Sequence, residues 1–130
     1  MIGGVLLDAQ SVVFGAFQAG QAVNNLQVVY LDGQYWKPSD PVTTGKGVPP
    51  QGIAIQSAAS GAIVQVMSLG IVSNSAWALA SGQPAFLGSG GGVIASSPTG
   101  SGNWVARVGI AQLGTVLLFN PEISPFQIGQ

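Results

Sequence analysis

The residues best suited to bind a cofactor are the glycines at 88–92, in the stretch FLGSGGGVIASSPTG. A dinucleotide-binding loop of the form G-x-G-x-x-G would need a third glycine at position 93, where the chain has Val93. Such a loop must also begin a helix whose first N–H groups bind the phosphate, whereas Pro98 interrupts the residues that follow. The sequence therefore predicts a glycine-rich hairpin turn at 88–92 and no cofactor.

Acid–base chemistry has few candidate residues, because the chain has four carboxylates, three basic side chains, no histidine and no cysteine. A carboxylate pair would have to face one cleft, but Asp32 and Asp40 both lie in turn-forming contexts. Lys37 and Lys46 are the lysines that could activate a serine. Both lie in loops beside proline or glycine, where we expect solvent exposure and an ordinary pKa. We therefore expect neither an enzyme nor a metal site.

The single arginine, Arg107, lies within the stretch WVARVGI. Regular alternation along a strand predicts two faces, with Trp104, Ala106, Val108 and Ile110 on one, and Val105, Arg107 and Gly109 on the other. One hypothesis for Arg107 is a contact with a carboxylate or carbonyl of another subunit. The alternative is an ordinary position on a solvated strand face.

The charge content separates this chain from ordinary soluble domains. Charged residues make up 5% of its 130 residues, with a net charge of −1, against about 25% in typical domains. So little basic charge argues against nucleic-acid binding. The apolar start of the chain is interrupted by Asp8, Gln10 and Ser11, so we expect neither a signal peptide nor a membrane span. A surface with so few charges is instead expected to be covered by other subunits.

Short β-rich runs separated by turn signals follow Gly20. Residues 26–31 (LQVVYL), then Asp32-Gly33, then QYW form a strong hairpin signal. Similar runs recur at spacings of about 8 to 12 residues, which predicts an all-β fold: a small antiparallel β-barrel, or a β-tulip or sandwich. We divide the chain into an N-terminal arm (1–19), a β domain (20–121) and a C-terminal tail (122–130).

The β domain contains a weak internal repeat, because the same turn and strand signals occur twice in the same order. The matched segments are Gly20-Gln21 with Gly82-Gln83, Asp32-Gly33 with 88–92, and Gly52-Ile53-Ala54 with Gly109-Ile110-Ala111. This order predicts two weakly similar strand-turn-strand units. The alternative is chance similarity between strands rich in glycine and alanine.

The arm and the tail carry apolar side chains on segments too short to complete a core. Polar or small residues at helical spacing would suit a short helix in the arm, whereas its β-branched residues and Gly15 favour an extended segment. We predict that these side chains contact other subunits or a capsid. They are Val5, Leu6, Leu7, Val12, Val13, Phe14 and Phe17 in the arm, and Ile123, Phe126 and Ile128 in the tail.

Over residues 18–121, the order Gly-Gln, strand, Asp-Gly, strand, Gly-Ile-Ala, turn, strand resembles the capsid decoration (cement) and head-fibre proteins of tailed bacteriophages. The stretch GQPAFLGSGGGVIASSPTGSGNWVARVGIAQLGTVLLFNP carries the same resemblance. It implies a compact β-barrel or β-tulip domain, assembled as a homotrimer on the outer capsid, that stabilises the capsid by bridging subunits of the major capsid protein. It also implies a virion protein made in the host cytoplasm, with no catalytic residue and no nucleic-acid, membrane or small-molecule partner.

An alternative function is a phage tail-fibre or spike module, or another glycan-binding β module. Its binding platform would come from Trp36, Trp77 and Trp104, on which a sugar ring could stack. Aromatic side chains are more often core or interface anchors.

Overall fold

The computed structural model describes residues 4–6, 12–14, 17–42, 48–122 and 125–128. The described chain is all-β, as predicted, with thirteen strands and one short 3-10 turn at Ser89–Gly91. The strands are β1 (Gly4–Leu6), β2 (Val12–Phe14), β3 (Gln18–Ala19), β4 (Val28–Asp32), β5 (Tyr35–Pro38), β6 (Gly52–Ala54), β7 (Val66–Asn74), β8 (Pro84–Leu87), β9 (Val93–Ile94), β10 (Trp104–Val105), β11 (Arg107–Leu113), β12 (Val116–Phe119) and β13 (Phe126–Gln127).

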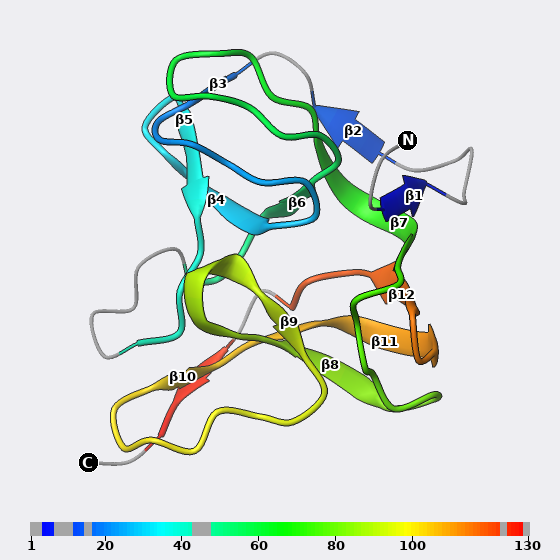
Figure 1. The fold of residues 1–130 in the computed structure, drawn as a ribbon. Coiled ribbons are helices and arrows are strands. Elements are labelled where there is room, and N and C mark those ends of the chain that lie inside the picture. Colours follow the sequence, from blue (N-terminus) through cyan, green and yellow to red (C-terminus); the bar gives the residue numbers. More distant parts are fainter. Residues whose placement is uncertain (1–3, 7–11, 15–16, 43–47, 123–124, 129–130) are drawn as a thin grey trace.

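The long strand β7 connects two groups of strands (Figure 1). Neighbouring strands follow the order β3-β5-β4-β6-β7-β12-β11-β8-β9, and β1 and β2 also pair with β7. The pairs in this path are antiparallel, except that β3 pairs with β5 in parallel. Its two end strands, β3 and β9, do not pair with each other, so the predicted barrel alternative is wrong and the arrangement is sandwich-like.

The predicted Asp-Gly hairpin is confirmed. Asp32 at the end of β4 pairs with Tyr35 at the start of β5, and only two residues connect the strands. Gly33 in that connection has a φ of +65°, a left-handed conformation that glycine adopts without steric strain.

The predicted repeat is present as two units with the same strand order, which we define as the first unit (residues 12–69) and the second unit (residues 70–122). In the first unit, β4 pairs with β5 and β6, and β6 pairs with β7. In the second unit, β8 pairs with β9 and β11, and β11 pairs with β12. The first half of β7 therefore corresponds to β12, and its second half begins the second unit.

Backbone hydrogen bonds reproduce this correspondence residue by residue. The bonds of the first unit run from Val23 N–H to Ala58 O (2.9 Å), Leu26 N–H to Ala54 O (2.6 Å) and Ala54 N–H to Gln27 O (2.9 Å). Those of the second run from Leu79 N–H to Gly114 O (2.9 Å), Gly82 N–H to Ala111 O (2.7 Å) and Ala111 N–H to Gln83 O (3.0 Å). The matches of Asp32-Gly33 with 88–92, and of the two Gly-Ile-Ala segments, agree with this register.

One predicted match in the repeat is wrong. The counterpart of Gly82-Gln83 is Leu26-Gln27, not Gly20-Gln21, because Leu26 and Gly82 make the same hydrogen bond and both have positive φ, +64° and +78°. Both segments contain the dipeptide Gly-Gln, but the residue of the first unit that adopts the backbone conformation of Gly82 is Leu26.

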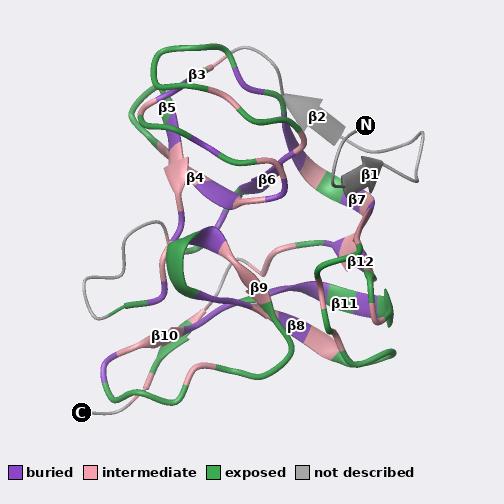
Figure 2. Cartoon of the chain, viewed as in Figure 1, coloured by how far each residue is buried: buried purple, intermediate pink, exposed green. Residues whose placement is uncertain are grey.

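Two apolar clusters form the core. The first unit closes one of its faces over a cluster containing Val23, Val29, Trp36 and Val66. The second cluster lies between the units, and its buried members are Leu26, Val28, Ile53 and Met67 from the first unit, with Val72, Ala85, Leu87, Ala106, Val108, Leu117 and Phe119 from the second. Figure 2 shows buried residues on the strands of both groups. We call the face of the first unit that carries Val28, Ile53 and Met67 its back face. It packs against the face of the second unit that carries Leu87, Val108 and Phe119, which we call the front face.

The described parts of the N-terminal segment are extended. β1 and β2 pair with opposite ends of β7, and β3 pairs with β5. The extended alternative therefore describes these residues, and the helix alternative does not. In the C-terminal segment, β13 pairs with β10.

Candidate functional site

An apolar row crosses four strands on the outer face of the second unit. Ile110 in β11 lies directly opposite Pro84 in β8 and Leu118 in β12, and Leu118 lies opposite Ile71 in β7. Directly opposite residues of antiparallel strands place their side chains on the same face of the sheet. These four residues form one continuous surface, which we call the outer row. Ile110 is 51% exposed, and the other three are half-buried.

A β-bulge in β11 brings Ile110 to this face. The pairing register between β11 and β8 shifts between Arg107 and Gly109, where Arg107 faces Phe86 and Gly109 faces Ala85. An extra residue of this kind changes which side chains share a face. The predicted alternation is therefore wrong: Val108 is buried, whereas Arg107 and Ile110 are both exposed.

Gly109 lets β11 and β12 approach each other closely beside the bulge. Its φ is +154°, and a Cβ atom at this position would collide with the carbonyl oxygen of Leu118. Glycine is therefore required here for both conformation and space. The Gly-Ile-Ala segment of β11 thus holds Ile110 directly beside Leu118.

The first unit has the same row, but there it is buried. Ile53 lies opposite Val28 and Met67, as Ile110 lies opposite Pro84 and Leu118. We call Val28, Ile53 and Met67 the inner row. All three are fully buried in the cluster between the units. Equivalent strand positions therefore form an internal contact in the first unit and an open surface in the second.

A cavity of about 230 Å³ lies along the outer row and includes Arg107 and Glu122 in its lining. The backbone N–H of Arg107 donates to Glu122 Oε1 (2.6 Å), and the N–H of Glu122 donates to the Arg107 carbonyl (3.0 Å). No ion pair joins the Arg107 guanidinium to a described residue. The outer row thus has an exposed cation at one end.

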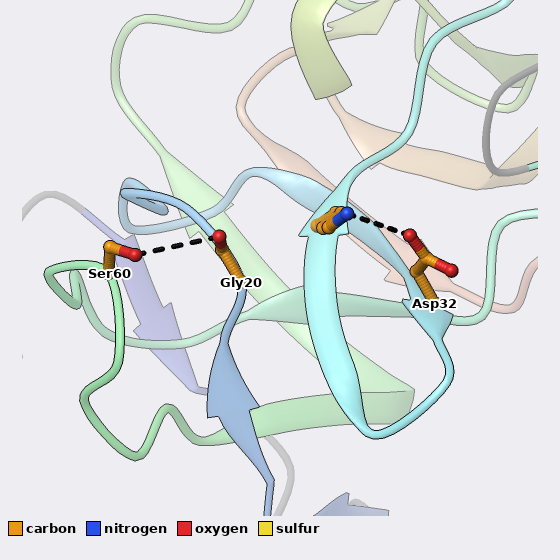
Figure 3. A network of polar contacts seen from close by, with 4 residues as sticks. Gly20, Asp32 and Ser60 are labelled. Atoms are coloured by element: carbon orange, nitrogen blue, oxygen red, sulfur yellow. Dashed lines mark hydrogen bonds and ion pairs between the residues drawn. The ribbon is translucent and has the colours of Figure 1, made fainter.

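Asp32 and Lys37 form an ion pair on the β4–β5 hairpin. Lys37 Nζ donates to Asp32 Oδ2 at 2.7 Å (Figure 3). Both side chains are partly exposed. The hydrogen bond and charge of Asp32 raise the pKa of Lys37 above 10.5, so the expectation of an ordinary pKa is wrong. A raised pKa favours the protonated amine, which cannot act as a base. Figure 3 also shows Ser60, whose hydroxyl donates to the carbonyl of Gly20 nearby (3.5 Å).

Asp40 connects the two units instead of forming a catalytic pair. Its Oδ1 accepts the N–H of Val42 (3.2 Å), which is a local turn contact, and its Oδ2 accepts the N–H of Gly90 (3.2 Å). Gly90 O also accepts a hydrogen bond from the side chain of Gln27 (2.5 Å). The glycine run at 88–92 is the β8–β9 hairpin turn, as predicted, and it docks onto the first unit.

The three tryptophans were candidates for the sugar-stacking platform of the alternative function, and two of them pack in or against the core. Trp36 is fully buried in the core of the first unit. Trp77 is half-buried against the cluster between the units, and Trp104 is half-buried in β10.

The predicted contact residues lie in several places. Val5 and Leu6 lie in β1, and Val12, Val13 and Phe14 lie in β2, whereas Leu7 and Ile123 fall outside the described residues. Phe17 packs against the core of the first unit. Phe126 in β13 is 61% exposed, and Ile128 is half-buried, its N–H donating to the carbonyl of Asn103 (2.8 Å). Among the predicted contact residues whose side chains the structure describes, Arg107 lines the cavity along the outer row, a surface that the sequence did not predict. The duplicated Gly-Ile-Ala segment marks equivalent positions in the two units, but it does not indicate which isoleucine is exposed.

The chain matches no protein-family model and no curated protein. In the described part of the chain, no three acidic residues lie close enough together to hold a metal ion. The same residues include no helix long and apolar enough to cross a membrane.

Proposed function

We propose that this chain is a structural virion protein without enzymatic activity, a decoration protein on the outer surface of a bacteriophage capsid. It acts as a homotrimer that bridges subunits of the major capsid protein and stabilises the shell. The protein is made in the host cytoplasm and joins the virion there.

The observation that carries this proposal is the outer row on a chain with so few charges. Ile110, Leu118 and Ile71 place apolar side chains next to one another on an open sheet face. Apolar surface contributes about 25 cal/mol per Å² when it is buried, so such a face is suited to lasting contact with protein. A scaffold on a capsid requires this kind of contact.

The charged residues support a structural role. Asp32 binds Lys37, and Asp40 holds the turn at Gly90. Glu122 accepts the backbone N–H of Arg107. Each of these carboxylates thus maintains the fold, which is the use expected in a protein that assembles and does not catalyse.

The β1 and β2 segments each add a short strand along β7 of their own chain. In this proposal the apolar residues of these segments and of the C-terminal segment contact the capsid. Several such contacts from one trimer reinforce one another, since each one bound raises the effective concentration of the next.

The direct test is to add gold-labelled protein to virions that lack it and to image where the label binds. We expect label on the head, together with a higher temperature of DNA release than in undecorated heads. Label on the tail would contradict the proposal, and binding of the isolated protein to a glycan array would support the tail-fibre or spike alternative.

A further inference from the structure

We propose that copies of this chain join head to tail, with the outer row of one copy docking onto the first unit of the next. This contact repeats between chains the packing that joins the two units within a chain. It rests on the proposed self-association and assigns the surfaces that make it.

The internal contact provides the template. The inner row, Val28, Ile53 and Met67, shares one buried cluster with the front face of the second unit. On that face Leu87, Val108 and Phe119 are buried in the same cluster. A row of this shape therefore already fits against the front of one unit.

The corresponding place on the first unit is an open groove. Leu31 holds the position of Leu87 in its hairpin, since Leu31 pairs with Trp36 as Leu87 pairs with Val93. Gln51 and Val108 each precede the glycine of a Gly-Ile-Ala segment.

The third position of the groove is Ser68. Ser68 follows Met67, as Phe119 follows Leu118. Met67 lies opposite Ile53, and Leu118 lies opposite Ile110, so Ser68 and Phe119 hold equivalent positions. Leu31, Gln51 and Ser68 all line one groove of about 660 Å³. The groove on the first unit thus corresponds in position to the part of the second unit that packs against the inner row.

The two free surfaces are complementary. The outer row matches the inner row position by position, and the groove matches the place that receives the inner row. The groove also includes Pro49, Pro50 and Asn120 in its lining, and none of its described lining residues is charged. It thus offers apolar surface to Ile110, and carbonyl and amide oxygens to the cation of Arg107. A second copy supplies the row in the spacing that the groove requires.

A contact between two different surfaces has a definite consequence for assembly. Each copy at the ends of such an assembly keeps one free surface, a row or a groove, so addition continues until the rotation between copies closes a ring. A closed ring of three gives the proposed homotrimer. A rotation that does not close would give a fibre.

The test uses one variant for each surface. Ile110→Asp places a charge in the outer row, and Ser68→Arg places one in the groove. Ile63→Asp is the control for the first, because Ile63 is 50% exposed and lies in a bridge to Gln18 in the first unit. Ser96→Arg in the exposed loop after β9 is the control for the second. Circular dichroism and the urea midpoint establish that each variant is folded.

We expect sedimentation velocity to show assembly of the wild type and of both controls. Ile110→Asp and Ser68→Arg should each need about tenfold or more higher concentration to assemble, since the introduced charge would lose its hydration in the contact. An equimolar mixture of these two variants should form dimers and nothing larger, because it retains one intact row and one intact groove.

Monomeric wild type at every concentration would overturn both this proposal and the proposed trimer. Trimers that persist in Ile110→Asp would overturn the head-to-tail contact alone. So would a mixture of the two variants that stays monomeric. The capsid location is decided separately by labelling, so its failure is distinguishable from the failure of this contact.

Discussion

Ile53 and Ile110 occupy the same position in two equivalent strands, yet Ile53 is completely buried and Ile110 is half exposed. Each lies between a glycine and an alanine. Ile53 lies opposite Val28 in β4, and Ile110 lies opposite Pro84 in the equivalent strand β8. Their difference comes from the packing of the units: the back of the first unit is covered by the second, and the back of the second is open.

Truncating these two isoleucines should therefore have very different effects on stability. Ile53→Ala should lower the free energy of unfolding by about 2 to 5 kcal/mol, because it leaves a cavity in the core between the units. Ile110→Ala should change it by no more than about 0.5 kcal/mol. Urea unfolding at low protein concentration measures both. Equal losses would show that the two faces are not packed as described.

The glycine run can be tested at two adjacent positions. Gly91 has a φ of +80°, and a Cβ there would lie 2.5 Å from Gln27 Cγ and 2.6 Å from the Val28 carbonyl oxygen. Gly90 has a φ of +64° with open space around it. Gly90→Ala should therefore cost about 1 to 2 kcal/mol from backbone strain alone. Gly91→Ala should cost more, because the hairpin must move away from the first unit. Thermal unfolding compares them, and equal effects would contradict this docking.

The Asp32–Lys37 ion pair predicts a dependence of stability on alkaline pH. Because the folded-state pKa of Lys37 is raised above 10.5, its contribution is fully present below that value and is lost as the pH rises through the folded-state pKa. Lys37→Gln should therefore be less stable than wild type at neutral pH, and the two should converge at strongly alkaline pH. Both side chains are partly exposed, so added salt should also reduce the difference. Urea midpoints across this pH range test the effect, and a gap that widens with pH would refute it.

Phe126 offers a test of capsid contact by the C-terminal segment. Phe126→Ser should reduce the number of copies bound per head, because it removes an exposed apolar side chain predicted to lie against the capsid. Leu113→Ser is a matched control, since Leu113 is 59% exposed on a different strand. Quantitative gel analysis of purified heads measures the occupancy. Equal occupancy for both variants would exclude Phe126 from the contact.

Local signals predicted the strands and turns well. The hairpin at Asp32-Gly33 and the glycine turn at 88–92 both formed where the sequence placed them, because turn chemistry depends mainly on adjacent residues. The repeat was also recognisable from the order of its segments. The match of Gly20-Gln21 with Gly82-Gln83 was wrong, because Leu26 adopts a positive φ that is expected mainly of glycine.

The outer row was not predictable from local sequence. Two identical Gly-Ile-Ala segments give no sign that one isoleucine is buried and the other exposed, since this depends on which sheet faces cover each other. The bulge before Gly109 also broke the alternation on which the face of Arg107 was assigned. Both effects arise from contacts between distant segments.

The position of β7 in the chain has a consequence for synthesis on the ribosome. β1, β2 and β6 have all been translated when Asn74 is added, but β12, which pairs with the second half of β7, has not. At a synthesis rate of about 5 to 20 residues per second, the edge of β7 that pairs with β12 stays unpaired for several seconds. An unpaired strand edge is a site for pairing with other nascent chains. The emergence of Val116–Phe119 from the ribosome is therefore the step that ends this period of exposure.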